Sequence, residues 1–159
     1  MESIVLFDTN HQNLKPLTYT RPVGDLRIGI LTIAEKWSQR LGLSISYRTE
    51  EYLQTKYPFV SSPDQLVIAS GLLPDESLLA AVLNLEKNQS LVADGKFIAA
   101  RTDTDEPSLD FFQTLSKIEY TKPYREVAFP WQIFSWNGDE IKNDFDLLTG
   151  GRQSMPIDE

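Results

Sequence analysis

The sequence predicts an α/β fold in which a mainly parallel sheet is flanked by helices, with an added β-hairpin. Short apolar runs alternate with amphipathic segments through the first half of the chain, as in proteins whose parallel strands are buried on both faces. An Asp-Gly pair then separates two further apolar runs, which is the pattern of a tight hairpin. With 41% hydrophobic residues among 159, the chain is long and apolar enough for one domain with a core.

The first strand is predicted at residues 4–7, a continuous apolar run that turn-forming residues end at Asp8. After a polar loop, apolar side chains recur at helical spacing over residues 30–41, which predicts an amphipathic helix. Gly42 stands where a C-terminal cap belongs, so the helix is expected to end there.

A second strand is predicted at residues 43–47, and a third at residues 66–69. Thr49 has the position of an N-cap for a short helix between these strands, and a further helix follows from Pro74. The resulting order of strand, helix, strand, helix, strand and helix implies right-handed crossovers and a parallel sheet.

The pattern changes after the third helix. Residues 91–99 contain the Asp-Gly hairpin, which we expect at the edge of the sheet. A short helix is predicted at residues 109–115 and a strand at residues 117–120. Two helical segments are predicted in the last part, over residues 130–138 and 140–148, with Asn-Gly closing the first.

The domain is expected to cover residues 1–148, followed by a linker at residues 149–159. A net charge of −8 argues against general nucleic-acid binding, which favours a basic surface. Without cysteine, the chain has no disulfide, thiolate nucleophile or cysteine-bound metal. No apolar run is long enough for a membrane span, and the first residues do not form a secretion signal, so a cytoplasmic location is expected.

The loop between the first strand and the first long helix is the leading candidate for a ligand site. An α/β fold brings the carboxyl end of a strand and the amino end of the next helix together there. Lys15, Arg21 and Arg27 lie in this loop, and two guanidinium groups with an ammonium group suit a polyphosphate. The alternative is that both arginines pair with the many carboxylates of the chain.

Three other polar residues fall near the same edge. Asp8 could contact magnesium if a nucleotide binds, or could be an ordinary turn aspartate. Ser70 and Gly71 end the third strand, where glycine would let the backbone approach a ligand, or they could form a plain turn. His11, the one histidine of the chain, is expected on the solvated surface, which excludes a histidine-based triad or zinc site.

Residues 14–32, from Leu-Lys-Pro-Leu-Thr-Tyr-Thr-Arg-Pro-Val to Ile-Leu-Thr, resemble the opening of a divergent sugar nucleotidyltransferase family. Residues 67–74 and 130–141 fit the same resemblance, which therefore spans nearly the whole chain. Members of this family resemble the amino-terminal domain of the bifunctional N-acetylglucosamine-1-phosphate uridylyltransferase and glucosamine-1-phosphate acetyltransferase.

The resemblance implies a Rossmann-like domain, normally followed by a left-handed β-helix through which the chains could form a homo-oligomer. It implies attack of a sugar 1-phosphate on the α-phosphorus of a nucleoside triphosphate, with Mg²⁺ bridging phosphates. The product would be a UDP-N-acetylglucosamine-type or glucose-1-phosphate-derived nucleotide sugar. The residues it implicates are Arg21 and Lys15 for catalysis, Asp8, Thr20 and Arg27 for the nucleotide and its phosphates, Ser70 and Gly71 for the sugar or base, and Asp8 for the metal.

The chain departs from the family pattern in one place. The glycine-rich turn after the first strand is replaced by residues 8–15, which contain no glycine, although Thr20-Arg21 resembles the family's Thr-Arg pair. Two alternatives to an enzyme follow. One is a non-catalytic module that binds a nucleotide or sugar phosphate and orients the β-helix domain, and the other is a structural domain that assists assembly.

Overall fold

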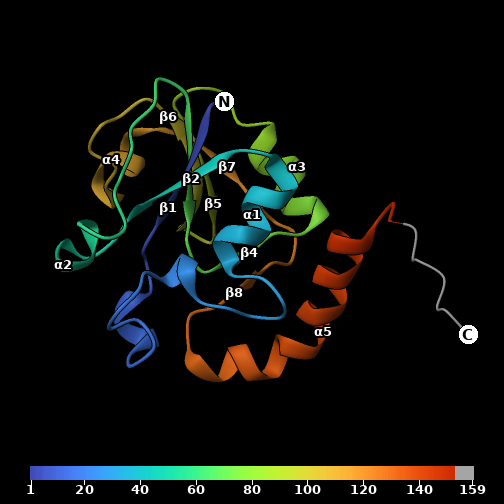
Figure 1. Ribbon diagram of the computed structural model, residues 1–159. Helices are drawn as coiled ribbons and strands as arrows, with labels where there is room; N and C mark the ends of the chain where they lie inside the picture. Colours follow the sequence, from blue (N-terminus) through green and yellow to red (C-terminus); the bar gives the residue numbers. More distant parts are fainter. Residues whose placement is uncertain (153–159) are drawn as a thin grey trace, which may run out of the picture.

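A six-stranded sheet forms the centre of the protein in the computed structural model, which describes residues 1–152 (Figure 1). Its spatial order is β2-β1-β3-β6-β5-β7. Because β6 pairs antiparallel with both β3 and β5 while the other pairs are parallel, β6 alone runs against the rest of this sheet. The predicted mainly parallel sheet is confirmed. The strands are β1 (Ser3–Phe7), β2 (Ser44–Arg48), β3 (Gln65–Ala69), β5 (Gln89–Ala93), β6 (Lys96–Thr102) and β7 (Ser116–Glu119).

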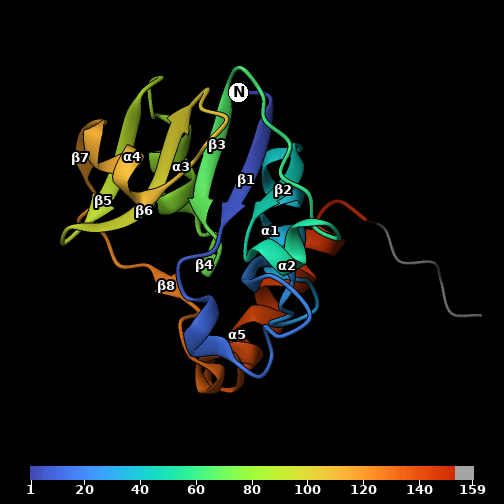
Figure 2. The ribbon, with the colours of Figure 1, turned by 90° about the vertical axis from the view of Figure 1, so that its left-hand side faces the viewer.

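Helices cover both faces of the sheet, as predicted (Figures 1 and 2). One face carries α1 (Ile33–Leu41) and α3 (Glu76–Leu83), and the other carries α2 (Glu51–Gln54) and α4 (Leu109–Thr114). Below the carboxyl ends of β1 and β3 lie two 3₁₀ turns, a two-stranded sheet and the long helix α5. These elements are η1 (His11–Leu14), η2 (Val23–Asp25), β4 (Leu72–Leu73), β8 (Arg125–Glu126) and α5 (Pro130–Thr149).

The core follows from the apolar runs that predict the central strands. Residues 4–6 of β1 and 66–69 of β3 are fully buried, and Val5 lies opposite Val67 in the parallel register. Each buried aliphatic side chain of this kind contributes about 1.5–3 kcal/mol relative to an exposed one. Burial therefore stabilises β1 and β3, the two strands that precede the candidate loop and Ser70.

The predicted helix caps are confirmed for the end of α1 but not for the start of α2. Thr32 and Glu35 form a capping box that starts α1, and Gly42 ends it in the left-handed conformation with φ +67°. The predicted cap at Thr49 is wrong, because Glu50 precedes α2 and makes no side-chain cap. The Thr49 hydroxyl instead donates to Asp8, 41 residues earlier, at 2.6 Å.

The hairpin is confirmed, but its predicted place at the sheet edge is wrong. Its second strand, β6, pairs with β3, and its first strand, β5, is covered by β7, which forms the edge. The turn at Asp94 and Gly95 has positive φ at both residues, as a tight hairpin requires. Local turn chemistry fixes the hairpin, whereas its neighbours are set by pairings between distant segments.

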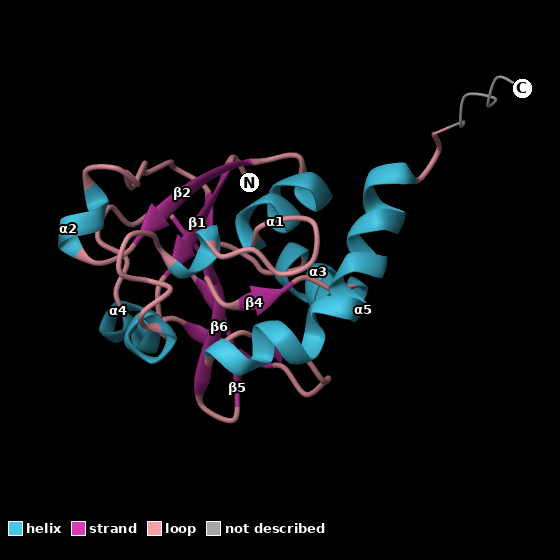
Figure 3. Cartoon of the chain, turned by 60° about the horizontal axis from the view of Figure 1, so that its bottom comes forward, coloured by secondary structure: helices cyan, strands magenta, loops and turns pink. Residues whose placement is uncertain are grey.

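The last helix differs from the two segments predicted. Residues 130–149 form one helix, which bends in its middle part in Figure 3. Asn137, expected to close the first segment, stays helical and its side-chain oxygen accepts a hydrogen bond from the Gly29 amide at 2.8 Å. Residues 153–159 of the predicted linker lie outside the described residues. Within the described part, no helix combines the length and apolar character of a membrane span.

Candidate functional site

The candidate loop lies at the topological switch point of the sheet. β1 has β2 on one side and β3 on the other, so the chain reverses its direction of winding between β1 and β3. Ligands of open α/β sheets bind outside the carboxyl ends of the strands at such a point. Asp8 follows β1 and Ser70 follows β3, so both predicted residues lie at this edge.

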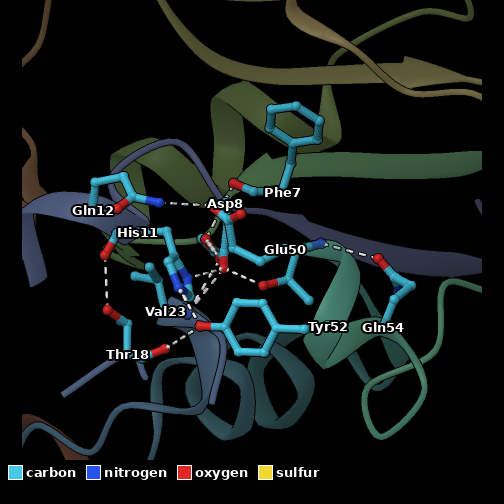
Figure 4. Close-up of polar contacts among 11 residues, drawn as sticks. Phe7, Asp8, His11, Gln12, Thr18, Val23, Glu50, Tyr52 and Gln54 are labelled. Carbon is cyan, nitrogen blue, oxygen red and sulfur yellow. Dashed lines mark hydrogen bonds and ion pairs between the residues drawn. The ribbon is translucent and has the colours of Figure 1, made fainter. Parts of the chain in front are cut away.

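Asp8 is the centre of a buried hydrogen-bond cluster (Figure 4). Its carboxylate, whose side chain is 3% exposed, accepts from the hydroxyls of Thr49 and Ser70 and from the Val23 amide. His11 Nδ1 lies 3.2 Å from Asp8 Oδ2 and is the fourth partner. This carboxylate therefore ties the ends of β1, β2 and β3 to both turns of the loop.

The prediction of a solvated His11 is wrong. The residue is 3% exposed, and its second ring nitrogen lies 3.3 Å from the Tyr52 hydroxyl on α2. The Tyr52 hydroxyl also donates to the Thr18 carbonyl, and the Thr18 hydroxyl donates to the His11 carbonyl at 2.7 Å. His11 is buried because its partners come from several elements, which no local pattern around it shows.

Ser70 and Gly71 are buried beneath the loop rather than open to it. The Ser70 hydroxyl is shared between Asp8 and the Phe7 carbonyl. A Cβ at position 71 would stand 2.5 Å from the Val127 carbonyl oxygen, so glycine here allows close approach of the segment after β8. Their predicted contact with sugar or base stays a prediction.

Arg21, Arg27 and Thr20 lie on the outer side of the loop, and all three are exposed. They line one cavity of about 480 Å³ together with the first turns of α5. Both arginines also line a second cavity, of about 540 Å³, against α1 and β2. The loop residues thus form two layers, a buried anchor around Asp8 and an exposed pair of guanidinium groups.

The charges around the two arginines differ. Arg27 lies 3.8 Å from the Glu35 carboxylate and donates to the Ile30 carbonyl, but its side chain is 58% exposed, and such pairs contribute little to stability. No carboxylate within residues 1–152 forms an ion pair with Arg21. Lys15 lies elsewhere, with its Nζ 5.4 Å from the centre of the Tyr19 ring, and lines neither cavity. Its predicted catalytic role stays a prediction.

Tyr47 forms part of the second cavity and packs edge-on against Tyr57, with 5.5 Å between the ring centres. Burial is the largest cause that raises the pKa of Tyr47, and the carboxylate of Asp25 raises it further. The phenol therefore keeps its proton near neutral pH, and its hydroxyl can donate as well as accept a hydrogen bond.

The residues present do not form a magnesium site from protein ligands alone. Within residues 1–152, no three or more His, Asp or Glu side chains are grouped in a way that could hold a metal ion by themselves. The oxygens of Asp8 are engaged by four hydrogen-bond donors, and Mg²⁺ needs near-octahedral oxygen ligands. The predicted metal role of Asp8 therefore stays a prediction.

A third cavity, of about 840 Å³, lies on the other side of Asp8. Arg48 contributes its only positively charged side chain, and its acidic lining residues are Asp8, Glu50, Glu51 and Asp110. This surface is less suited to polyphosphate than the arginine pair, because four carboxylates and one guanidinium group line it.

Sequence reasoning missed the side chains of α5 that complete the first cavity, namely Pro130, Ile133 and Phe134. The sequence around these residues does not indicate the contact, because they lie about 110 residues after the loop that they contact. Phe134 is 82% exposed, although phenylalanine is among the residues most often buried.

Comparison with known proteins identifies the family of the chain and a solved structure with a similar fold. The family model for sugar nucleotidyl transferases matches residues 4–153. No curated protein matches the chain significantly. Among solved structures, it is similar in fold to a Bacillus anthracis protein assigned as a glucose-1-phosphate thymidylyltransferase and solved with sucrose. The identity is 12% over 89% of this chain and 95% of that chain, with a TM-score of 0.50. By the match to its family model, this chain belongs to the sugar nucleotidyl transferase family.

Proposed function

We propose that the chain is a sugar-1-phosphate nucleotidyltransferase whose arginine pair, Arg21 and Arg27, holds the phosphates of the substrates. The observation that carries the proposal is that these two exposed guanidinium groups line the same two cavities, at a loop anchored to the switch point of the sheet. Guanidinium groups bind phosphate oxygens in pairs of hydrogen bonds, and a fixed loop reduces the entropic cost of placing them.

In this reaction a phosphate oxygen of the sugar 1-phosphate attacks the α-phosphorus of the nucleoside triphosphate. A new phosphorus–oxygen bond forms as the bond to the β-phosphate breaks, and pyrophosphate leaves. The protein needs no nucleophile of its own, because positioning and charge neutralisation suffice. Arg21 contacts the transferring phosphoryl group and Arg27 the flanking phosphates, with Thr20 as an additional donor. Magnesium enters with the triphosphate, as part of the substrate.

Asp8 has a positioning role in this proposal. Its carboxylate accepts from the Val23 amide at 3.2 Å, two residues after Arg21, and so fixes the backbone that presents the guanidinium group. The missing glycine-rich turn is consistent with this assignment, since side chains rather than backbone amides would bind the phosphates.

The finer parts of the proposal rest on the resemblance. Uridine or thymidine triphosphate and the 1-phosphate of N-acetylglucosamine or glucose are the substrates to test first. From the same resemblance we propose kinship with the bifunctional uridylyltransferase and acetyltransferase. We also propose that residues 1–148 form the domain, that a β-helix follows the linker, that chains oligomerise through this β-helix, and that the protein is cytoplasmic. The family match does not favour the non-catalytic alternative.

The test is release of pyrophosphate from UTP or dTTP with each sugar 1-phosphate. Arg21→Ala and Arg27→Ala should each lower the rate by roughly tenfold to a hundredfold, the loss expected for a charge-assisted hydrogen bond. Lys117→Ala, on the edge strand β7 away from the arginine pair, is the charge-matched control and should keep the wild-type rate. Nucleotide binding without turnover for every substrate pair would select the non-catalytic module instead.

A further inference from the structure

The two cavities beside the arginine pair differ in chemistry. The cavity toward α5 has mostly apolar walls, formed by Pro16, Leu17, Leu26, Pro130, Ile133 and Phe134. The cavity toward α1 and β2 has polar walls, formed mainly by Asp25, Thr32, Glu35, Ser38 and Tyr47. With volumes of about 480 and 540 Å³, each falls within the range of small-molecule sites, roughly 300–1,000 Å³.

The apolar cavity suits a nucleobase. Phe134 keeps 82% of its surface exposed at the wall of this cavity, so one face of its ring is available for stacking. Every base has a π-face, so any base can stack on an aromatic side chain, whichever hydrogen-bonding groups the base carries. No carboxylate lines this cavity, and its two positive charges come from Arg21 and Arg27.

The polar cavity suits a sugar and disfavours phosphate. The carboxylates of Asp25 and Glu35 repel anions but accept hydrogen bonds from hydroxyl groups. Glu35 and Thr32 are engaged in the cap of α1, and Tyr57 donates to Asp25 at 3.1 Å. The Tyr47 hydroxyl has no hydrogen-bond partner within residues 1–152, so it remains available to a ligand hydroxyl.

A nucleotide sugar has the same order of parts, with a base at one end, a diphosphate in the middle and a hydroxyl-rich ring at the other. We propose that Arg21 and Arg27 hold the diphosphate, that the base stacks on Phe134 in the apolar cavity, and that the sugar lies in the polar cavity against Tyr47. This assignment rests on the proposed function and names the residues that select each half of the substrate.

The base half is tested by calorimetric titration of the whole chain with UTP and, separately, with sodium pyrophosphate. Phe134→Ala should weaken UTP binding roughly tenfold, the size of one lost base–aromatic stack, and leave pyrophosphate binding unchanged. Phe145→Ala is the matched control, since Phe145 is 57% exposed on the same helix and lines neither cavity. Phe134→Ala with wild-type affinity for UTP, or with equal losses for UTP and pyrophosphate, would overturn the assignment.

The sugar half is tested by comparing UDP with UDP-N-acetylglucosamine. The wild-type chain should bind the nucleotide sugar several-fold more tightly, and Tyr47→Phe should remove this difference while keeping UDP affinity. An unchanged difference would overturn the placement of the sugar. Failure of the wild-type chain to bind UTP, dTTP and pyrophosphate would instead contradict the proposed function, so the two failures are distinguishable.

Discussion

The ammonium group of Lys36 on α1 forms a buried ion pair with the carboxylate of Asp144 on α5, 108 residues later in the chain. Glu140 contributes a second carboxylate at 2.9 Å from the same ammonium group. The other oxygen of Asp144 accepts from the amides of Ile30 and Leu31 at 2.9 and 3.0 Å. This network holds α5 against the segment that follows Arg27, and so completes the apolar cavity.

Replacing Lys36 by methionine should strongly destabilise the fold. The change keeps the volume of the side chain but leaves two carboxylates buried without a cation, which costs about 3–5 kcal/mol. Urea unfolding measures the loss. Lys142→Met, at an exposed position on α5, should change the free energy of unfolding by at most about 0.5 kcal/mol. A similar small effect for both variants would show that α5 is not held by this network.

Gly29→Ala, compared with a control glycine, should distinguish the cost of backbone strain from the cost of disturbed packing between α5 and the loop. Gly29 has φ +79°, and a Cβ there would stand 2.6 Å from Asp144 Oδ2 and 2.7 Å from the Glu140 carbonyl carbon. Gly42, with φ +67° and no neighbour within 4 Å, is the matched control. Gly42→Ala should cost about 1–2 kcal/mol from backbone strain alone, and Gly29→Ala clearly more. Equal losses would contradict close packing of α5 on this loop.

Asp8→Asn distinguishes a loop anchor from a metal ligand. An amide cannot accept all four hydrogen bonds that the carboxylate receives, so the loop should loosen and the fold should lose about 1–3 kcal/mol. As an anchor, Asp8 supports UTP binding equally in excess Mg²⁺ and in a metal chelator, and calorimetry should show the same fold-loss in both. A loss that occurs only with Mg²⁺ would assign Asp8 to the metal.

Asp64 should make the stability of the fold depend on pH in the acidic range. The hydrogen bonds from Arg101, at 2.8 and 2.7 Å, are the largest cause that holds the pKa of Asp64 well below its usual range, and the amino terminus adds to them. Because the folded state binds this proton less readily than the unfolded state, the stabilisation is present above about pH 4 and is lost as the pH falls further.

Asp64→Asn should therefore lower the free energy of unfolding by about 1 kcal/mol at pH 7, and the difference from the wild-type chain should shrink below about pH 4. Glu106→Gln, an exposed position without an ion pair within residues 1–152, is the control. A difference that stays constant between pH 7 and pH 3 would contradict the role given to Asp64.

The parts of the fold that follow from local pattern were predictable from sequence. Apolar runs gave β1 and β3, the Asp94-Gly95 turn gave the hairpin, and Gly42 gave the end of α1. The neighbours of the hairpin were not predictable, because β7 covers β5 through a pairing between separate segments. A helix bend likewise replaced the break expected at Asn137, whose side chain has a partner 108 residues earlier.

The sequence predicted which loop residues lie at the edge of the sheet, including the buried Asp8 and Ser70, but not which other elements they contact. Clustered cations in a loop after a strand pointed to Arg21 and Arg27, which do share two cavities. The burial of Lys36 and His11 depends on partners from other elements, and the wall formed by Phe134 depends on how α5 docks. Sequence spacing carries no signal for such contacts, since each requires the assembled fold.

The most direct test of the central claim is calorimetric titration of UTP and dTTP, each in turn, into single-arginine variants. Arg21→Ala and Arg27→Ala should each weaken binding of the recognised nucleotide at least roughly tenfold. Arg48→Ala, in the separate cavity beside Asp8, should bind within about twofold of the wild-type chain. Loss of binding in Arg48→Ala with wild-type affinity in the other two variants would contradict the claim that the arginine pair holds the phosphates.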